Sequence, residues 1–323
     1  MIYPKFIEKN ATIGVCAPSA GVGKKLDIYT QSLDFLKQEG YKIKETASVR
    51  KNNDRSAGAK TRAKEIDELV TDKDVDMIVY ATGGDYMIEV MPYIDFEHIK
   101  ENPKWMMGYS DPTNILFPVT CRYDIATLYG FNAGSYEFKN PRFQKENLSI
   151  VSGKMAKQKS HSHFMRYADY EAGTKHPVKW VAKKDMTIEG RLIGGCFEAI
   201  EKLIGTPYDY VSDFIERHKD DGIVWYFDVF AESSYNFYLA LLQMKYAGYF
   251  RHCKGVLIGR VAFPNVDNPK FDYLKAADKA LGNIPHIMEM DIGHVDPRMT
   301  MINGAMVKAN YHDGKGGISF RLE

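Results

Sequence analysis

The chain has 323 residues, and its 43 Lys and Arg residues nearly balance its 42 Asp and Glu residues. A chain of this length exceeds the usual size of one domain, so two domains are expected. The near-neutral charge, without a basic run interleaved with aromatic residues, argues against nucleic acid as a partner.

The amino-terminal sequence MIYPKFIEKNATIGV lacks the basic start and apolar stretch of a signal peptide, and no later apolar run is long enough to cross a bilayer. We therefore expect a cytoplasmic protein with no membrane partner. Cys16, Cys121, Cys196 and Cys253 are scattered and form no CxxC pair. Four buried, reduced thiols are expected, rather than a disulfide framework or a cysteine zinc site.

Short β-rich runs alternate with amphipathic stretches over the first 130 residues. In order they are TIGVCAP, KKLDIYTQSLDFLKQEG, YKIKETASV, AKTRAKEIDELVTD and DMIVYAT. This alternation predicts βαβ units, and therefore an α/β domain over residues 1–150 with a parallel, flavodoxin- or Rossmann-like sheet.

Between residues 135 and 189 the periodicity is lost in polar sequence, so residues 151–184 are expected to connect two domains. The remaining segment, 185–323, carries more β-rich runs than helical ones. We expect it to form a smaller, strand-rich α+β domain.

The segment KWMMGYSDPTNILF predicts a strand that leads into Ser110 and a helix that opens at Pro112. A serine at such a turn lies at the carboxyl end of a parallel sheet, near the positive end of a helix dipole, where a nucleophile is accessible. A helix N-cap is the alternative interpretation of Ser110. The G-x-S-x-G motif is not matched, because Pro112 occupies the last position.

Gly83 and Gly84 follow the β-rich run DMIVYAT directly. Paired glycines at a strand end allow the backbone to approach a ligand, so their N–H groups could bind an oxyanion. An ordinary tight turn is the alternative.

His294 follows a β-rich run in MDIGHVDPRMT and is placed to accept a proton at neutral pH. His161 and His163, in HSH, resemble metal ligands but lack neighbouring carboxylates, so neither a metal nor a cofactor is expected.

Asp228 ends the apolar run GIVWYFDVF. A carboxylate at such a position is costly to bury unless it is paired, and an imidazole that needs orientation would pair with it. Glu232, four residues later, is the second candidate for the same role.

Together these segments resemble the LD-carboxypeptidase family, which includes the peptidases that give immunity to microcin C. The resemblance covers nearly the whole chain in order: IGVCAPSAG, RSAGAKTRAKEIDELVTDKDVDMIVYATGG, YIDFEHIKENPKWMMGYSD, GRLIGGCFEAIEKLIGTPY, WYFDVF, LLQMKYAGYF, GVLIGRV and IGHVDPRMTMINGA.

The resemblance implies a Ser–Glu–His type of triad, with Ser110 as the nucleophile and His294 as the base. The residue that matches the family's glutamate is Asp228, which is one methylene shorter. A second departure is Cys196, where the family commonly has asparagine. The resemblance further implies acyl transfer, with the oxyanion held by the backbone N–H groups of Gly84 and Asp111.

The substrate implied is a small peptide-like molecule, either a muropeptide or an aminoacyl-nucleotide of the microcin type. The sequence Thr82-Gly83-Gly84-Asp85 is more similar to the microcin-immunity branch than to muropeptide enzymes, which carry Arg-Gly-Gly-Tyr there. The rival hypothesis is a catalytically silent peptide-binding protein of the same fold. Family members often form homodimers, although no residue of this chain indicates one. A dinucleotide site is disfavoured, because APSAGVGKK fits neither G-x-G-x-x-G nor the P-loop.

Overall fold

The computed structural model describes residues 1–136, 142–154, 157–266 and 268–323. The chain folds into two compact units. The first consists of Met1–Met155 and Thr300–Asn303, and the second of Ala156–Met299 and Gly304–Glu323. The chain therefore returns briefly to the first unit near its carboxyl end.

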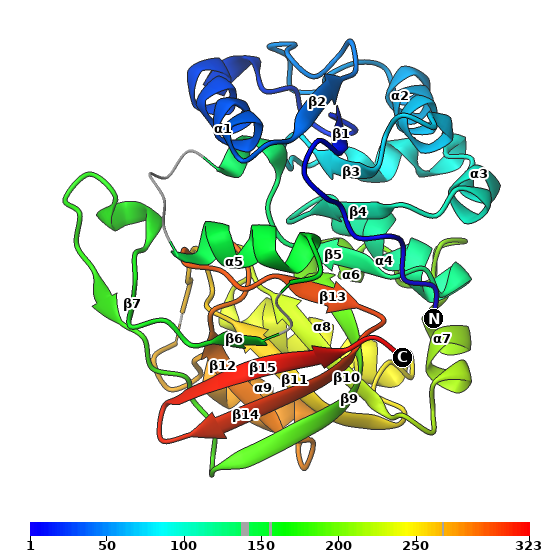
Figure 1. Ribbon diagram of the computed structural model, residues 1–323. Helices are drawn as coiled ribbons and strands as arrows, with labels where there is room; N and C mark the ends of the chain where they lie inside the picture. The colour runs from blue at the N-terminus through cyan, green and yellow to red at the C-terminus, as the bar shows by residue number, and fades with distance from the viewer. Residues whose placement is uncertain (137–141, 155–156, 267) are drawn as a thin grey trace. The chain divides into compact units, whose positions relative to one another are not determined.

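A six-stranded sheet forms the centre of the first unit, in the order β13-β5-β4-β3-β1-β2 (Figure 1). Its strands are β1 (Thr12–Cys16), β2 (Lys42–Glu45), β3 (Met77–Tyr80), β4 (Trp105–Gly108), β5 (Thr127–Tyr129) and β13 (Met301–Asn303). All are parallel except β13, which pairs with β5 in the antiparallel sense. The predicted parallel α/β fold is confirmed.

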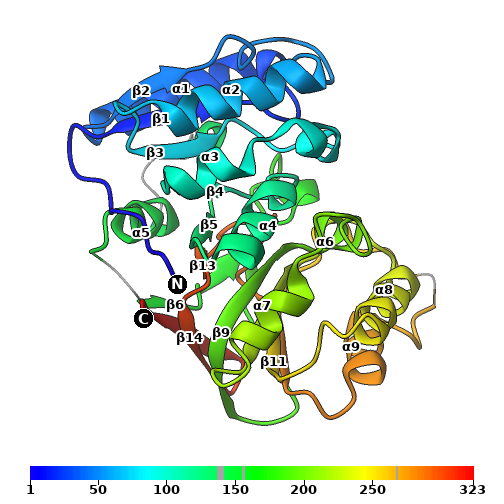
Figure 2. The same cartoon turned by 90° about the vertical axis from the view of Figure 1, so that its right-hand side faces the viewer.

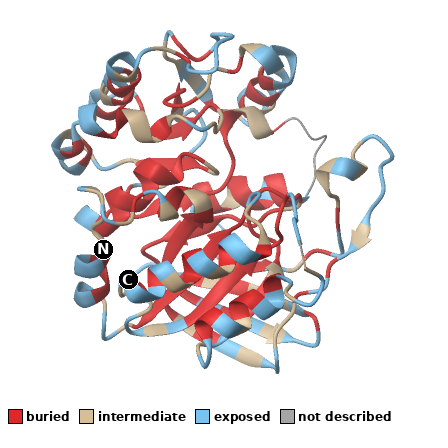
Figure 3. Ribbon diagram, turned by 180° about the vertical axis from the view of Figure 1, so that it is seen from behind, coloured by how far each residue is buried: buried red, intermediate tan, exposed pale blue. Residues whose placement is uncertain are grey.

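Helices cover both faces of this sheet, with α1 and α5 on one side and α2, α3 and α4 on the other (Figure 1). Their bounds are α1 (Leu26–Gln38), α2 (Ala59–Thr71), α3 (Phe96–Glu101), α4 (Thr113–Tyr123) and α5 (Arg142–Val151), with the 3₁₀ turns η1 (Gly23–Lys25), η2 (Met87–Tyr93) and η3 (Ala133–Ser135). Because both faces are covered, every residue of β3 and β4 is buried (Figure 3), which explains why these strands are apolar throughout.

A seven-stranded sheet forms the centre of the second unit, in the order β12-β11-β10-β9-β14-β15-β6. Its strands are β6 (Lys157–Lys159), β9 (Met186–Cys196), β10 (Ile223–Asp228), β11 (Cys253–Gly259), β12 (His286–Met290), β14 (Met306–His312) and β15 (Lys315–Arg321). Strands β9 to β12 are parallel, whereas β14, β15 and β6 are antiparallel. The expectation of a separate strand-rich sheet is confirmed.

Of the helices of the second unit, α8 and α9 lie side by side on one face of the sheet (Figure 2). They are α6 (Phe197–Glu201), α7 (Val211–Arg217), α8 (Ser234–Tyr246) and α9 (Tyr273–Leu281). Side-chain caps begin α8 at Ser233 and α9 at Asp272. No helix among the described residues is both long and apolar enough to cross a membrane.

Residues 157–184 of the polar segment that was expected to connect two domains group with the second unit. They contribute β6, the small hairpin of β7 (His163–Phe164) and β8 (His176–Pro177), and the turn η4 (Tyr167–Asp169). The run MTMINGAMVKANY is divided at Gly304, because its first strand joins the first sheet and its second joins the other.

Candidate active site

Ser110 lies two residues beyond β4, in the turn that leads into α4, and it is half-buried. Its φ is +74°, in the left-handed region that is uncommon for a residue with a side chain. Strained backbone of this kind at a strand-to-helix turn is typical of a serine whose hydroxyl is presented for chemistry. Pro112 is the N-cap of α4, so the helix begins at Thr113, one residue after the predicted start.

Side chains from the neighbouring strand β5 and the residues after it hold this turn in place. The backbone N–H of Ser110 donates to the Tyr129 hydroxyl at 2.9 Å. The side chain of Asn132 accepts from Tyr109 N–H at 3.1 Å and donates to its carbonyl at 3.3 Å. The strained turn is therefore stabilised by hydrogen bonds from outside it, and the N–H of Ser110 is already occupied.

The Gly83–Gly84 turn follows β3 and lies against Ser110. A Cβ added to Gly83 would lie 3.0 Å from the Ser110 Cβ and 3.1 Å from its Oγ. Gly84 has a φ of +153°, and a Cβ added there would lie 2.4 Å from the Ser19 Oγ. Both positions are therefore tight for a side chain, and the positive φ of Gly84 favours glycine there.

Two backbone amides beside Ser110 have no acceptor among the described residues, those of Gly84 and Asp111. They belong to turns that follow the neighbouring parallel strands β3 and β4. Unused amides near a serine hydroxyl are the groups that an oxyanion requires.

The Asp111 side chain is buried and accepts three hydrogen bonds. Its Oδ2 accepts from the Ser19 hydroxyl and from Met87 N–H at 2.9 Å, and its Oδ1 accepts from the Asn114 amide at 2.8 Å. Burial raises the pKa of Asp111, and the nearby charge of Asp85 raises it further, while these hydrogen bonds oppose the shift.

In the second unit, Asp228 and His294 form a buried pair. Asp228 ends β10, and its Oδ2 lies 2.7 Å from the His294 Nδ1. Its Oδ1 accepts from the backbone N–H of His294 at 3.1 Å. Asp228 therefore contacts both the ring and the backbone of the histidine, although 66 residues separate them.

The close fit of this pair depends on Gly293. The residue has a φ of +98°, and a Cβ added to it would lie 1.8 Å from the Asp228 Oδ1. The loop that carries His294 is fixed further by Asp291, whose carboxylate accepts from His161 N–H and from the Trp180 indole, both at 3.1 Å. The loop that carries the imidazole is thus held by the contacts of Asp228 and Asp291.

Glu232, the alternative partner for His294, is held through its backbone. Its N–H donates to the Glu198 carboxylate at 3.3 Å, and its carbonyl accepts from the Tyr273 hydroxyl at 2.6 Å. Burial raises the pKa of Glu201, and the charge of Glu232 raises it further. The carboxylate that contacts the imidazole is that of Asp228.

Sequence reasoning missed Glu198 and Phe230. One oxygen of Glu198 accepts from the N–H groups of Phe230 and Ala231, both at 2.8 Å, as well as from Glu232. The Phe230 ring then packs on the His294 ring, with 4.6 Å between centroids. The only signal in the sequence was the position of these residues beside the candidate segments.

Cys196 and the candidate metal ligands were the other residues singled out in the sequence. Burial raises the pKa of the Cys196 thiol well above its ordinary value, so it is a poor nucleophile. Within the described part of the chain, no three His, Cys, Asp or Glu side chains are grouped to hold a metal ion.

Comparison with known proteins assigns both parts of the chain to one family. Residues 13–130 match the LD-carboxypeptidase N-terminal domain, and residues 189–309 match the LD-carboxypeptidase C-terminal domain. The chain belongs to the LD-carboxypeptidase family. The resemblance seen in the sequence is confirmed, and the family is one of peptidases.

Relatives within the family carry different names. A putative carboxypeptidase of Vibrio cholerae is 25% identical over 221 residues, 64% of this chain and 66% of that protein, so the match spans slightly less than two thirds of it. A probable murein peptide carboxypeptidase of Bacillus subtilis is 24% identical, covering 95% of this chain and 91% of the relative. The microcin C7 self-immunity protein MccF of Escherichia coli is 33% identical over 103 residues, 32% of this chain and 30% of that protein.

The family fold is also seen in solved structures. The structure of MccF in complex with glutamyl sulfamoyl guanosine superposes with a TM-score of 0.84, covers 98% of both chains and shares 18% sequence identity. At this identity the likeness establishes the fold alone.

Proposed function

We propose that this LD-carboxypeptidase family member is a serine peptidase or amidase that hydrolyses an amide bond of a small peptide-like substrate through an acyl-enzyme. In this proposal Ser110 is the nucleophile, His294 the general base and Asp228 the acid that orients it. The observation that carries the proposal is the buried contact of 2.7 Å between Asp228 Oδ2 and His294 Nδ1. Such a contact fixes the imidazole so that its Nε2 is the nitrogen left for proton transfer.

The chemistry follows from these roles. His294 Nε2 accepts the proton of the Ser110 hydroxyl, and Oγ forms a bond to the amide carbonyl carbon. The negative charge that develops on the carbonyl oxygen is stabilised by the N–H groups of Gly84 and Asp111. The C–N bond then breaks, and the amine leaves with the proton from His294. Water activated by the same imidazole hydrolyses the acyl-enzyme.

A planar, ring-bearing substrate is favoured by a row of aromatic side chains beside His294. Phe230 and Phe263 pack edge to face with 5.0 Å between centroids, and Phe263 stacks on Tyr167 at 5.0 Å. Phe230 is 38% and Phe263 45% exposed, so the row presents apolar ring surface against which a planar group can stack. The glutamyl sulfamoyl guanosine bound by MccF has a planar base, so the row supports an aminoacyl-nucleotide as substrate.

A muropeptide is the competing substrate, and the probable murein peptide carboxypeptidase among the relatives supports it. Incubation of the protein with an aminoacyl sulfamoyl nucleotide and with a muramoyl tetrapeptide, followed by mass spectrometry, separates the two. We expect cleavage of the amide in the first. Exclusive release of the terminal amino acid from the second would reverse the assignment. A cytoplasmic location and a homodimer remain predictions.

Labelling with a fluorophosphonate tests the serine mechanism itself. The unmodified protein should react at Ser110, and both Ser110→Ala and His294→Ala should abolish labelling while circular dichroism stays unchanged. No labelling of the unmodified protein would instead favour a catalytically silent binding protein of the same fold.

A further inference from the structure

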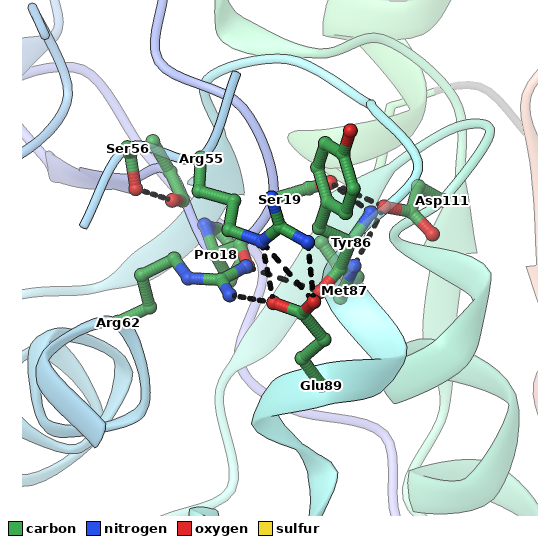
Figure 4. Close-up of polar contacts among 10 residues, drawn as sticks. Pro18, Ser19, Arg55, Ser56, Arg62, Tyr86, Met87, Glu89 and Asp111 are labelled. Carbon is green, nitrogen blue, oxygen red and sulfur yellow. Dashed lines mark hydrogen bonds and ion pairs between the residues drawn. The ribbon is translucent and has the colours of Figure 1, made fainter. Parts of the chain in front are cut away.

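A buried serine, Ser19, occupies the loop after β1 and contacts two other loops of the first unit (Figure 4). Its hydroxyl donates to Asp111 Oδ2 and accepts from the backbone N–H of Tyr86 at 3.0 Å. The same Asp111 oxygen accepts from Met87 N–H at 2.9 Å. The backbone amides of Tyr86 and Met87, which follow β3, are therefore both bound by the hydrogen-bonded pair of Ser19 and Asp111.

This pair determines where the Gly84 amide lies. Gly84 is two residues before Tyr86 and passes so close to Ser19 that a Cβ on it would lie 2.4 Å from the hydroxyl oxygen. The other end of the pair is the side chain of Asp111, whose own backbone amide is the second donor of the proposed oxyanion hole. Side-chain contacts thus connect the two backbone donors.

Arg62 holds the same two loops from the side of α2 (Figure 4). Its guanidinium is fully buried and donates to the Pro18 carbonyl at 2.7 Å, the Tyr86 carbonyl at 3.1 Å and the Glu89 carboxylate at 2.7 Å. The loops after β1 and β3 therefore cannot move apart without breaking buried polar contacts, which is costly.

We propose that the Ser19–Asp111 pair is a positioning device that sets the Gly84 amide against the Asp111 amide, so that the oxyanion hole is already formed before substrate binds. The inference rests on the proposed function, because it assigns a task to residues around the same hydroxyl. Neither side chain touches the substrate in this scheme. Their effect is on the transition state, because amide donors stabilise the oxyanion only when they are held at the correct distance.

The matched control for Ser19 is Ser32. Ser32 is also fully buried in the first unit, its hydroxyl donates to the Ala133 carbonyl, and it accepts from Tyr136 N–H at 2.7 Å. Replacement of either serine by alanine removes the same group and the same number of hydrogen bonds. Of these two serines, it is Ser19 whose hydroxyl is bonded to the loop that carries Gly84, at the N–H of Tyr86.

The experiment measures the inactivation rate constant kinact and the inhibitor constant KI of a fluorophosphonate. In this reaction Ser110 Oγ bonds to phosphorus, fluoride leaves, the serine proton passes to His294, and the phosphoryl oxygen occupies the oxyanion hole. We expect Ser19→Ala to lower kinact by about 10- to 100-fold, as for partial loss of an oxyanion donor, with KI within twofold. Ser32→Ala should keep kinact within twofold, although both variants lose similar thermal stability.

The inference can fail with or without the proposed function. If the unmodified protein reacts and Ser19→Ala keeps the same kinact, the positioning role is wrong and the serine mechanism stands. The same conclusion follows if kinact falls equally in Ser19→Ala and Ser32→Ala. If the unmodified protein does not react, the proposed function fails and the positioning role fails with it.

Discussion

Several residues in this protein have their properties set by close neighbours. Ser110 adopts a positive φ because Tyr129 and Asn132 hold the turn around it, and Asp228 is buried because His294 pairs with it. The sequence identified Ser110, His294 and Asp228 from their places after β-rich runs. It did not distinguish Asp228 from Glu232, because only the folded chain shows which carboxylate reaches the imidazole.

The first prediction concerns this choice of acid. Asp228→Asn should lower kcat on the cleaved amide substrate by about 10⁴-fold, because an amide in place of the carboxylate favours the wrong histidine tautomer. Glu232→Gln should change kcat by less than tenfold, since its side chain does not hold the imidazole. The reverse order in steady-state kinetics would transfer the role to Glu232.

The second prediction concerns Gly293. Gly293→Ala should lower the free energy of unfolding by more than about 3 kcal/mol, because its Cβ would overlap the Asp228 carboxylate at 1.8 Å in addition to the backbone strain. Gly282→Ala is the control, since Gly282 also has a positive φ of +63° but nothing lies within 4 Å of its Cβ. We expect it to cost only the strain, about 1 kcal/mol, in urea denaturation. Equal losses would contradict the steric argument.

At the scale of elements, function depends on loops that follow parallel strands and on what anchors them. The alternation of β-rich and amphipathic segments predicted where these loops begin, because strand and helix periods are visible locally. Their anchors could not be predicted. Glu198, for example, lies on the short helix α6 and binds the loop after β10, a contact that depends on β9 and β10 being neighbours in the sheet.

The third prediction tests this anchor. Glu198→Ala should increase hydrogen–deuterium exchange in residues 229–232, because the amides of Phe230 and Ala231 lose their acceptor. It should also lower kcat by about tenfold, since Phe230 would no longer be held against His294. Glu201→Ala, on the same helix, should leave both measurements unchanged. Unchanged exchange in the Glu198 variant would exclude an anchoring role.

The fourth prediction is a dependence of stability on pH that arises where Arg55 and Arg62 contact Glu89 in η2. Hydrogen bonds from Arg55 and Arg62 lower the pKa of Glu89 from 4.5 to about 2. A lowered folded pKa stabilises the protein above pH 4.5, and this contribution is lost as pH falls from 4.5 towards 2.

Thermal melting from pH 6 to pH 3 checks this sign. Glu89→Gln should lower Tm at pH 6 and make Tm less sensitive to pH below 4.5. The control, Glu68→Gln, affects only an exposed pair with Lys64 at 3.6 Å and should reproduce the slope of the unmodified protein. A Glu89→Gln curve parallel to the unmodified one would refute the assignment.

At the scale of the whole molecule, the chain does not divide into two consecutive pieces. The strand β13 leaves the second half of the sequence and completes the first sheet beside β5. The Thr300 hydroxyl accepts from the Asn147 amide at 2.7 Å, and the Asn303 amide donates to the Thr127 hydroxyl at 3.2 Å. The first unit is therefore incomplete without residues 300–303.

The fifth prediction follows from this topology. Residues 1–155 expressed alone should aggregate, because the edge of β5 would be exposed without its antiparallel partner. The same fragment with residues 299–304 attached through a flexible linker should remain monomeric and melt at a higher temperature. Size-exclusion chromatography and thermal melting compare the two. Identical behaviour would show that β13 adds nothing to the first unit.

The sequence by itself determined the local features of this protein: the α/β start, the strand-rich end, the family, and a serine, a histidine and two carboxylates at the ends of predicted strands. These are short-range properties, set by periodicity, turn chemistry and motif order. The tertiary structure decided which residues and strands, distant in the sequence, contact one another. Ser19 bonds to Asp111 across 92 residues and Asp228 to His294 across 66, and β13 enters the first sheet from the far end of the chain. Such contacts depend on strand order, which brings loops together at one edge of a sheet and leaves no trace in the sequence of either loop.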